Sequence, residues 1–161
     1  RTAPALEAAV RAMRATYGEH SYFAGRALLA QARVLFASGQ AEAAQRALDA
    51  AMQSDQQGLR LHHAHLLAEI DLLRSQLAAK RGDQNQEKAL QDAALAHLPA
   101  ELFAEDHPLR AAMQAQILLT RAGPLTASDR LRLEQSAQVL GAAQAADSPL
   151  LIAARQRLQR D

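Results

Sequence analysis

His62, His63, His65 and Glu69 stand close together near the middle of the chain, and the spacing of three of them suggests metal binding. His62, His65 and Glu69 follow one another at i, i+3 and i+7, so a helix would place them on one face. Histidine nitrogen and glutamate oxygen are zinc ligands, and three of them with an open fourth position form a catalytic zinc geometry. Ligands from a single helix converge poorly on a tetrahedron, however, and no supporting acid is evident beyond Asp71. We favour capping and hydrogen-bonded packing roles for the histidines, and metal binding stays an open alternative.

Two arginines offer a second kind of chemistry, the recognition of carboxylates. Arg26 and Arg33 are seven positions apart, which puts both on one face of a helix. Together with Arg110 they can clamp a carboxylate or an acidic peptide through charge-assisted hydrogen bonds. The alternative is that the arginines pair with carboxylates of their own surface, because exposed ion pairs are common and individually weak. The candidates for such pairing are Glu19, Glu42 and Glu69.

Other catalytic arrangements are missing from the sequence. It has no cysteine, and therefore no thiolate nucleophile, disulfide or cysteine-ligated zinc. It has no Gly-rich phosphate loop, nucleophile elbow or zinc-protease motif. The adjacent carboxylates Glu105 and Asp106 fall in a turn, where helix capping explains them. We therefore expect neither an enzyme nor a cofactor, and a metal-dependent hydrolase is the weakest alternative.

Charge and hydropathy narrow the choice of partners. The 18 basic and 17 acidic residues give a net charge of +1, which indicates neither nucleic acid nor an anionic membrane. No apolar run approaches the length of about 18 residues that a membrane-spanning helix needs. The absence of cysteine and of a signal peptide favours the cytoplasm. Because the chain begins at Arg1 rather than at Met, we expect it to be a piece of a longer protein.

Composition and punctuation predict an all-α fold of seven to eight helices. Ala and Leu dominate the apolar residues, and both are strong helix formers. Gly and Pro stand between the apolar-rich runs rather than inside them. The predicted helices cover about residues 4–17, 22–38, 41–52, 59–81, 86–98, 107–122, 127–140 and 149–161.

Caps and stripes refine these helices. Predicted N-caps are Ser21, Asp106 with Pro108 in the first turn, and Thr126 with Asp129 as a capping box; predicted stops are Gly18, Gly39, Gly82, Gly123 and Gly141. The buried stripes are predicted to be Leu28, Ala32 and Leu35; Ala44, Leu48 and Ala51; Leu66, Ile70, Leu73 and Leu77; Leu133, Ala137 and Leu140; and Leu151, Ala154 and Leu158. Met13, Met52 and Met113 are expected in the core. Leu6 and Val10 are expected to be exposed at the N-terminal end, which would allow copies of the chain to associate there.

The helix-closing glycines repeat at a nearly constant interval. Gly39 and Gly82 are 43 positions apart, and Gly82 and Gly123 are 41 apart. A longer helix precedes each of these glycines and a shorter one follows, so the repeating unit is a helical hairpin. Such a hairpin cannot bury its apolar face alone, and neighbouring hairpins are therefore expected to stack.

The first hairpin resembles a tetratricopeptide repeat. Its residues Leu28, Ala32, Leu35, Gly39, Ala44, Leu48 and Ala51 follow that family's order of large, small, large, glycine, small, large and small side chains. The stretches 17–21 (YGEHS) and 105–108 (EDHP) look like the turn between repeats of the kinesin light chain. The second and third hairpins depart from the pattern, because Asp71 or Arg74 intrudes in one and Gln116 or Ala115 takes the small position in the other.

The resemblance implies a single TPR-like α-solenoid over residues 1–161, a right-handed superhelix of antiparallel hairpins. It implies the second helix of an earlier repeat at 1–18, repeats at 19–57, 58–99 and 100–143, and a capping helix at 144–161. Family members hold a peptide or partner helix in the groove lined by the first helices. By this resemblance the groove positions are Arg26, Leu29, Arg33 and Phe36, with Gln76, Arg110 and Gln116 in later units.

A protein-interaction module is therefore the leading functional hypothesis, with a protein or peptide, acidic by preference, as the partner. By analogy with similar domains, the parent would be a bacterial regulatory or signalling protein. The lysine and asparagine clamp that some family members use for C-terminal carboxylates is missing, as is the asparagine ladder of kinesin light chains. A domain that senses a small anionic or peptide ligand is the second hypothesis.

Overall fold

The fold is all-α, as the composition predicts. The computed structural model describes residues 2–54, 60–121, 123–143 and 148–160, and within these ranges the chain forms eight helices. They are α1 (Thr2–Tyr17), α2 (Tyr22–Ala37), α3 (Ala41–Ser54), α4 (Arg60–Lys80), α5 (Gln84–Ala96), α6 (Pro108–Thr120), α7 (Ala127–Ala143) and α8 (Pro149–Arg160). The predicted number and order of helices are confirmed, and most ends differ from the prediction by one to three residues.

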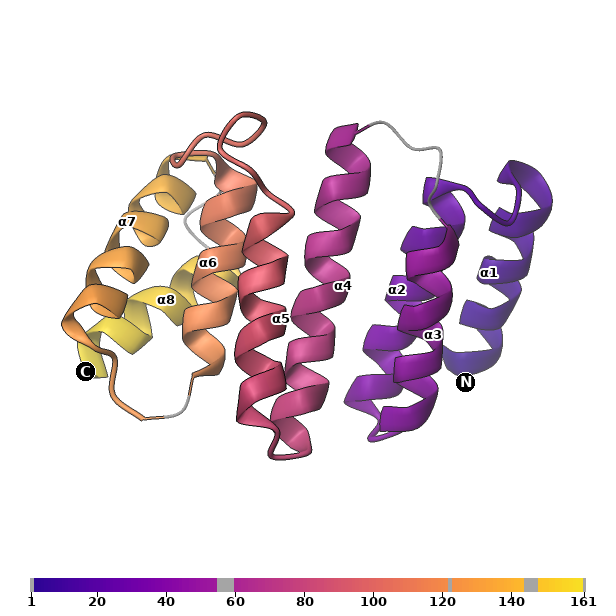
Figure 1. Cartoon of the computed structure of the whole chain (residues 1–161), viewed down its shortest axis with the longest axis horizontal. Coiled ribbons are helices and arrows are strands. Elements are labelled where there is room, and N and C mark those ends of the chain that lie inside the picture. The colour runs from indigo at the N-terminus through magenta and orange to yellow at the C-terminus, as the bar shows by residue number, and fades with distance from the viewer. Residues whose placement is uncertain (1, 55–59, 122, 144–147, 161) are drawn as a thin grey trace. The chain divides into compact units, whose positions relative to one another are not determined.

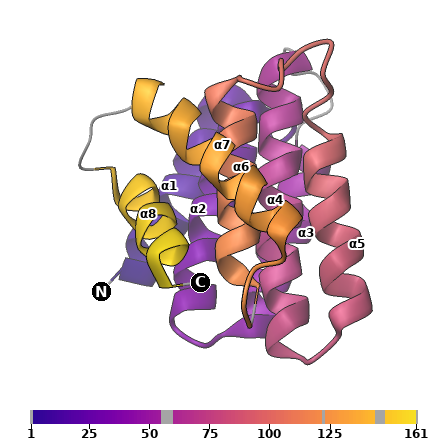
Figure 2. The same cartoon turned by 90° about the vertical axis from the view of Figure 1, so that its left-hand side faces the viewer.

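The helices pack mostly as sequential pairs within two compact units, Arg1–His97 and Leu98–Asp161. In the first unit α2 packs on α3 and α4 on α5, while α1 packs on α2 and α4 also packs on α2 and α3 (Figure 1). In the second unit α6 and α7 form the pair, and α8 packs on both of them (Figure 2). These contacts are consistent with stacked hairpins. The predicted repeat boundaries at 57/58 and 143/144 lie outside the described residues or at their edge.

Helix α2 begins and ends where the sequence indicates. The side-chain oxygen of Ser21 accepts a hydrogen bond from the N–H of Ala24 at 3.2 Å, so the predicted N-cap is confirmed. Gly39 follows the helix with a φ of +80°, a left-handed conformation that other residues adopt only with strain. A Cβ at this position would meet no atom within 4 Å, so the backbone conformation rather than packing explains the glycine.

Two predicted helix ends in the second unit are wrong. The N-cap of α6 is His107 rather than Asp106, since His107 Nδ1 accepts from the N–H of Leu109 at 3.1 Å. The imidazole is held there by an edge-on contact with the buried ring of Phe103, at 5.1 Å between centroids. Gly141 does not end α7, which continues to Ala143, and a Cβ built on it would lie 3.5 Å from the guanidinium of Arg155 on α8.

One apolar cluster forms the core of the first unit. It contains Val10, Leu28, Leu29, Ala32, Ala44, Ala47, Leu48, Ala51, Leu66, Ile70, Leu73 and Leu77, with Leu35 and Phe36 partly buried against it. The predicted stripes are thus confirmed, except that Leu35 lies at the edge. The expected exposure of Val10 is wrong, because α1 packs on α2 and leaves that side chain 6% exposed. Met52 is also not a core residue: it lies about 100° around α3 from Ala51 and is 37% exposed.

A second cluster forms the core of the other unit. Its members are Ala111, Ala115, Leu118, Leu133, Ala137, Leu140, Leu151 and Ala154, with Leu158 partly buried against them. These residues include every member of the stripes predicted on α7 and α8. Met113 is buried as expected, at 3% exposure.

The polar residues that interrupt the second hairpin's pattern form a chain of hydrogen bonds and ion pairs. Asp71 on α4 is buried, and its Oδ2 lies 3.0 Å from Nε2 of His97 at the end of α5. Arg74, one turn further along α4, lies 3.7 Å from Asp71 Oδ1 and also pairs with Asp49 on α3. Both residues therefore have structural partners, and α4 is tied to two neighbouring helices. The packing role expected of the histidines is confirmed at His97.

Helix α2 approaches α3 and α4 most closely at Gly25. A Cβ at this position would lie 2.7 Å from Ser54 Oγ and 2.8 Å from Leu66 Cδ2, closer than side chains normally tolerate. Neither neighbour is free to move, since Leu66 is fully buried and Ser54 Oγ donates to the carbonyl of Ala51 at 2.8 Å. Glycine is thus required here by packing.

Replacing Gly25 should therefore destabilise the protein although alanine is the better helix former. We expect Gly25→Ala to lower the free energy of unfolding by about 1–2 kcal/mol, because overpacking outweighs the gain in helix propensity. The matched control is Gly141→Ala, whose Cβ has normal van der Waals distances and should stabilise by up to about 1 kcal/mol. Urea denaturation of both variants measures the difference, and a stabilising Gly25→Ala would contradict the close approach.

A second set of polar contacts lies at the N-terminal end of α7. The N–H of Asp129 donates to Thr126 Oγ1 at 3.1 Å, which confirms Thr126 as the predicted cap. The Asp129 carboxylate accepts from Arg121 Nη1 at 2.7 Å. Burial raises the pKa of Asp129, but the hydrogen bond with the Thr126 side chain and the charge of Arg121 outweigh it, and the pKa is lowered overall.

This lowered pKa predicts an acid-dependent contribution to stability. A carboxyl group whose pKa is lower in the folded state stabilises above its unfolded pKa of about 4, and the contribution is lost as the pH falls through the folded pKa. We expect Asp129→Asn to cost about 1 kcal/mol at pH 7 and progressively less below about pH 4. Asp92→Asn, at an exposed position on α5, is the control. A gap between Asp129→Asn and the wild type that stayed constant down to pH 3 in urea denaturation would contradict the assignment.

Candidate binding face

Helices α2 and α4 run in the same direction, and their side chains meet in matching order. Tyr22 lies against His62 at 5.2 Å between ring centroids. Further along, Arg26 pairs with Glu69, 43 positions later, and the Lys80 ammonium lies near the carbonyl of Phe36, 44 positions earlier. We call this surface the α2–α4 face; its members are Tyr22, Arg26, Arg33 and Phe36 on α2 and His62, His65, Glu69 and Lys80 on α4.

A single carboxylate at the centre of the face holds both predicted arginines. Arg33 Nη2 donates to Glu69 Oε1 at 2.8 Å, and Arg26 Nη1 pairs with Glu69 Oε2. The Glu69 side chain is 14% exposed, whereas those of Arg26 and Arg33 are 35% and 49% exposed. The expectation that the arginines pair with a carboxylate of their own surface is confirmed for Glu69.

This centre carries more positive than negative charge. Two guanidinium groups share one carboxylate, and His65 Nε2 lies a further 4.0 Å from Glu69 Oε2. Burial and the neighbouring charge of Arg26 lower the pKa of Arg33, although an arginine stays protonated at neutral pH. A second carboxylate arriving at the exposed side of Arg33 would relieve the repulsion between the two cations.

An aromatic group borders the N-terminal end of the face. Tyr17 and Phe23 are about half exposed, with ring centroids 4.4 Å apart, and Phe23 also contacts Tyr22 at 5.7 Å. These three make up most of the five Tyr and Phe side chains in the protein. The helix and repeat patterns do not predict this group, but the density of aromatic residues between positions 17 and 23 is unusual in this sequence and indicates it.

The other groove positions predicted in the first unit have different surroundings. Leu29 is 1% exposed within the core, so it supports α2 and presents no side chain to a partner. Phe36 is half-buried, and the Lys80 ammonium lies 3.8 Å from its ring centroid. Gln76 is half-buried on α4. The structure thus brings together Arg26, Arg33 and Phe36 on one face.

Arg110 and Gln116 belong to the second unit. The Arg110 guanidinium donates a hydrogen bond to the carbonyl oxygen of Leu98. Arg110 thus stabilises the second unit and does not join the arginines of the first. Gln116 is half-buried on α6.

The proposed metal ligands on α4 contact other side chains instead of converging on one point. His62 lies against the ring of Tyr22, and Glu69 is engaged by two arginines. Within the described ranges no group of three histidine, cysteine or acidic side chains is close enough to hold a metal ion. A structural role is shown instead for His20, whose Nδ1 lies 3.2 Å from the carbonyl oxygen of Gln53.

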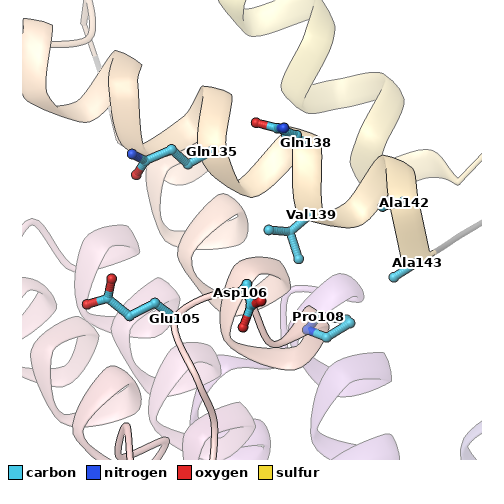
Figure 3. A pocket seen from close by; sticks show the side chains of 8 residues that line it. All are labelled: Glu105, Asp106, Pro108, Gln135, Gln138, Val139, Ala142 and Ala143. Carbon is cyan, nitrogen blue, oxygen red and sulfur yellow. The ribbon is translucent and has the colours of Figure 1, made fainter.

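The second unit contains a cleft of about 560 Å³ between the start of α6 and the end of α7. Val139 points from α7 toward Asp106 and Pro108 on the opposite side (Figure 3). Gln135 and Glu105 also line it. The cleft therefore offers two carboxylates and the amides of Gln135 and Gln138 around a small apolar surface.

The first unit contains another cleft, which the sequence pattern does not predict. It is lined by Arg11, Arg14 and Arg46 from α1 and α3. The spacing of Arg11 and Arg14 by three positions indicated a shared helix face, but nothing local indicated that Arg46 would join them.

No protein-family model matches the sequence, and a search of the curated proteins finds no match either. Of the helices that the structure describes, none combines the length and the apolar character needed to cross a bilayer. Functional conclusions therefore rest on the geometry of the side chains.

The central ion pairs predict how Glu69 contributes to stability. We expect Glu69→Gln to lower the free energy of unfolding by about 1–2 kcal/mol, because two neighbouring guanidinium groups lose their shared counter-charge. Added salt should narrow the gap to the wild type, since it screens both the lost attraction and the remaining repulsion.

The control for this variant is Glu134→Gln, which removes an exposed i, i+4 pair with Arg130. It should change stability by no more than about 0.5 kcal/mol. Equal effects of the two substitutions in urea denaturation would show that Glu69 has no special role.

Proposed function

We propose that the chain is a protein-interaction module of the tetratricopeptide type, in which stacked hairpins form a right-handed superhelix. Its first unit binds an acidic segment of another protein along the α2–α4 face. The observation that carries this proposal is the centre of the face, where two arginines share one carboxylate and Arg33 is half exposed.

The register of α2 and α4 supports the repeat assignment. Most groups that meet across the two helices are 40 to 44 positions apart: Tyr22 and His62, Arg26 and Glu69, and Phe36 and Lys80. Only the long side chain of Arg33 reaches Glu69 over a shorter separation of 36 positions. The intervals between the helix-closing glycines are similar, at 43 and 41 positions. A solenoid places corresponding helices of successive hairpins side by side in this way.

The chemistry of the face suits a carboxylate-bearing peptide. A guanidinium group has five N–H donors, and Glu69 engages only part of those on Arg26 and Arg33. A carboxylate bound to them would form charge-assisted hydrogen bonds, while the exposed rings of Tyr17 and Phe23 offer apolar contact at one end. Recognition of acidic motifs by clustered arginines is a recurring way to bind a peptide segment.

Charge reversal on the face is the test. We expect a fluorescein-labelled peptide rich in glutamate to bind the full chain, and its glutamine counterpart to bind at least about tenfold more weakly. Arg33→Glu should weaken binding of the glutamate peptide by a similar factor, because it removes one cation and places a second carboxylate beside Glu69. Fluorescence anisotropy at fixed ionic strength measures both effects.

The charge-matched control is Arg160→Glu, at an exposed position in the last turn of α8, which should leave the affinity unchanged. Equal binding of the two peptides, or an unchanged affinity for Arg33→Glu, would sink the proposal. If free citrate bound at Arg33 while neither peptide did, the chain would be a sensor of a small anionic ligand instead.

A further inference from the structure

A cleft of about 500 Å³ lies on the side of α2 where α1 and α3 pack. Helices α1 and α3 each contact α2 but do not pack on one another, and they form the two walls. We call it the α1–α3 cleft. It is lined by residues 7, 10, 11 and 14 of α1, residues 28, 31 and 35 of α2, and residues 43, 46, 47 and 50 of α3.

The spacing of these residues shows the direction of the cleft. Each helix contributes positions that span seven residues at steps of three and four, so each presents one straight stripe about 10 Å long. The cleft therefore runs along the helix axes for two turns, the form of a groove that accepts another helix.

The walls of the α1–α3 cleft carry more positive than negative charge. Arg11, Arg14 and Arg46 line it together with one carboxylate, Glu7. Within the part of the chain that the structure describes, none of these arginine side chains forms an ion pair or hydrogen bond, in contrast to Arg26, which pairs with Glu69.

The side chain of Arg14 contains a buried hydrogen-bond donor. Its Nε is buried, yet it has no hydrogen-bond partner among the described residues. A buried N–H without an acceptor is unfavourable, and such groups in native proteins are usually satisfied by a partner, a ligand or water. A carboxylate brought into the cleft by a bound partner would supply such an acceptor.

The floor of the α1–α3 cleft is apolar. Val10 and Leu28 are almost fully buried, and Leu35 is partly exposed beside them. The α3 wall contributes the small side chains of Ala43 and Ala47, which would let another backbone approach closely. An apolar floor between basic walls is the complement of an amphipathic helix with carboxylates on both sides of its apolar stripe.

We propose that the α1–α3 cleft is a second binding site, and that its occupant is an acidic amphipathic helix of a partner protein. The carboxylates of that helix pair with Arg11, Arg14 and Arg46, and its apolar stripe covers Leu28 and Leu35. This site lies on other residues than the α2–α4 face and does not depend on the function proposed for that face.

The probe is a hydrocarbon-stapled helical peptide with leucine at i, i+3, i+4 and i+7 and glutamate on both sides of the leucine stripe. Two control peptides carry glutamine in place of glutamate, or the same residues in an order without a helical stripe. We expect the full chain to bind the probe, and both control peptides to bind at least about tenfold more weakly. Equal binding of either control peptide would overturn the proposal.

Two kinds of variant locate the probe. Arg14→Gln with Arg46→Gln should weaken binding at least about tenfold, while the charge-matched pair Arg155→Gln with Arg160→Gln on α8 should leave it unchanged. Ala43→Trp keeps the charges and fills the cleft, and it should abolish binding while circular dichroism and thermal melting show an intact fold. Retained binding in both cleft variants would overturn the proposal.

Two other outcomes would also overturn it. Loss of probe binding in Arg33→Glu, with no effect of Ala43→Trp, would place the probe on the α2–α4 face. Sedimentation that shows a dimer of the wild type and a monomer of Ala43→Trp would make a second copy of the chain the occupant.

Discussion

The first unit depends on the close packing of α2 against α3 and α4 at Gly25. Because no side chain separates the helices there, Leu66 reaches the backbone of α2 and the core cluster closes around it. The same approach brings side chains more than 40 positions apart in sequence into contact, as in the pair Arg26 and Glu69. A wider separation of the two helices would leave these cations without their shared carboxylate.

Helix α2 contributes to both proposed sites, and the arginines on its two sides differ in whether they form ion pairs. On the α4 side, Arg26 and Arg33 share Glu69, so the surface is largely neutralised and keeps a modest excess of positive charge. On the other side, three arginines of α1 and α3 line a cleft with one carboxylate, Glu7, and form no ion pair with any residue that the structure describes. The floor of that cleft includes Leu28, a member of the core cluster, so the stability of α2 and the shape of the cleft are linked.

Polar residues in this protein form contacts between helices and are not confined to the solvent-exposed surface. Asp71 is buried between Arg74 and His97, and the chain of contacts continues to Asp49, so polar side chains link three helices. Such a chain is satisfied only when all its members are in place, which disfavours other packings of the same apolar stripes. His107 acts in a similar local way as the cap of α6.

The sequence by itself determined the helices and their order, because the signals are local: Ser21 and Thr126 cap the helix that follows each of them, Gly39 ends α2, and apolar stripes repeat with the helical period. It also indicated three carboxylates of the same surface, beside a carboxylate of a binding partner, as candidates to pair with Arg26 and Arg33. Only the tertiary structure decided that Glu69 is the partner, that Leu29 is buried, and that Arg46 joins Arg11 and Arg14 around a cleft. The physical reason is that such contacts depend on the distance and rotation between separate helices, and the spacing of residues within one helix contains no information about either.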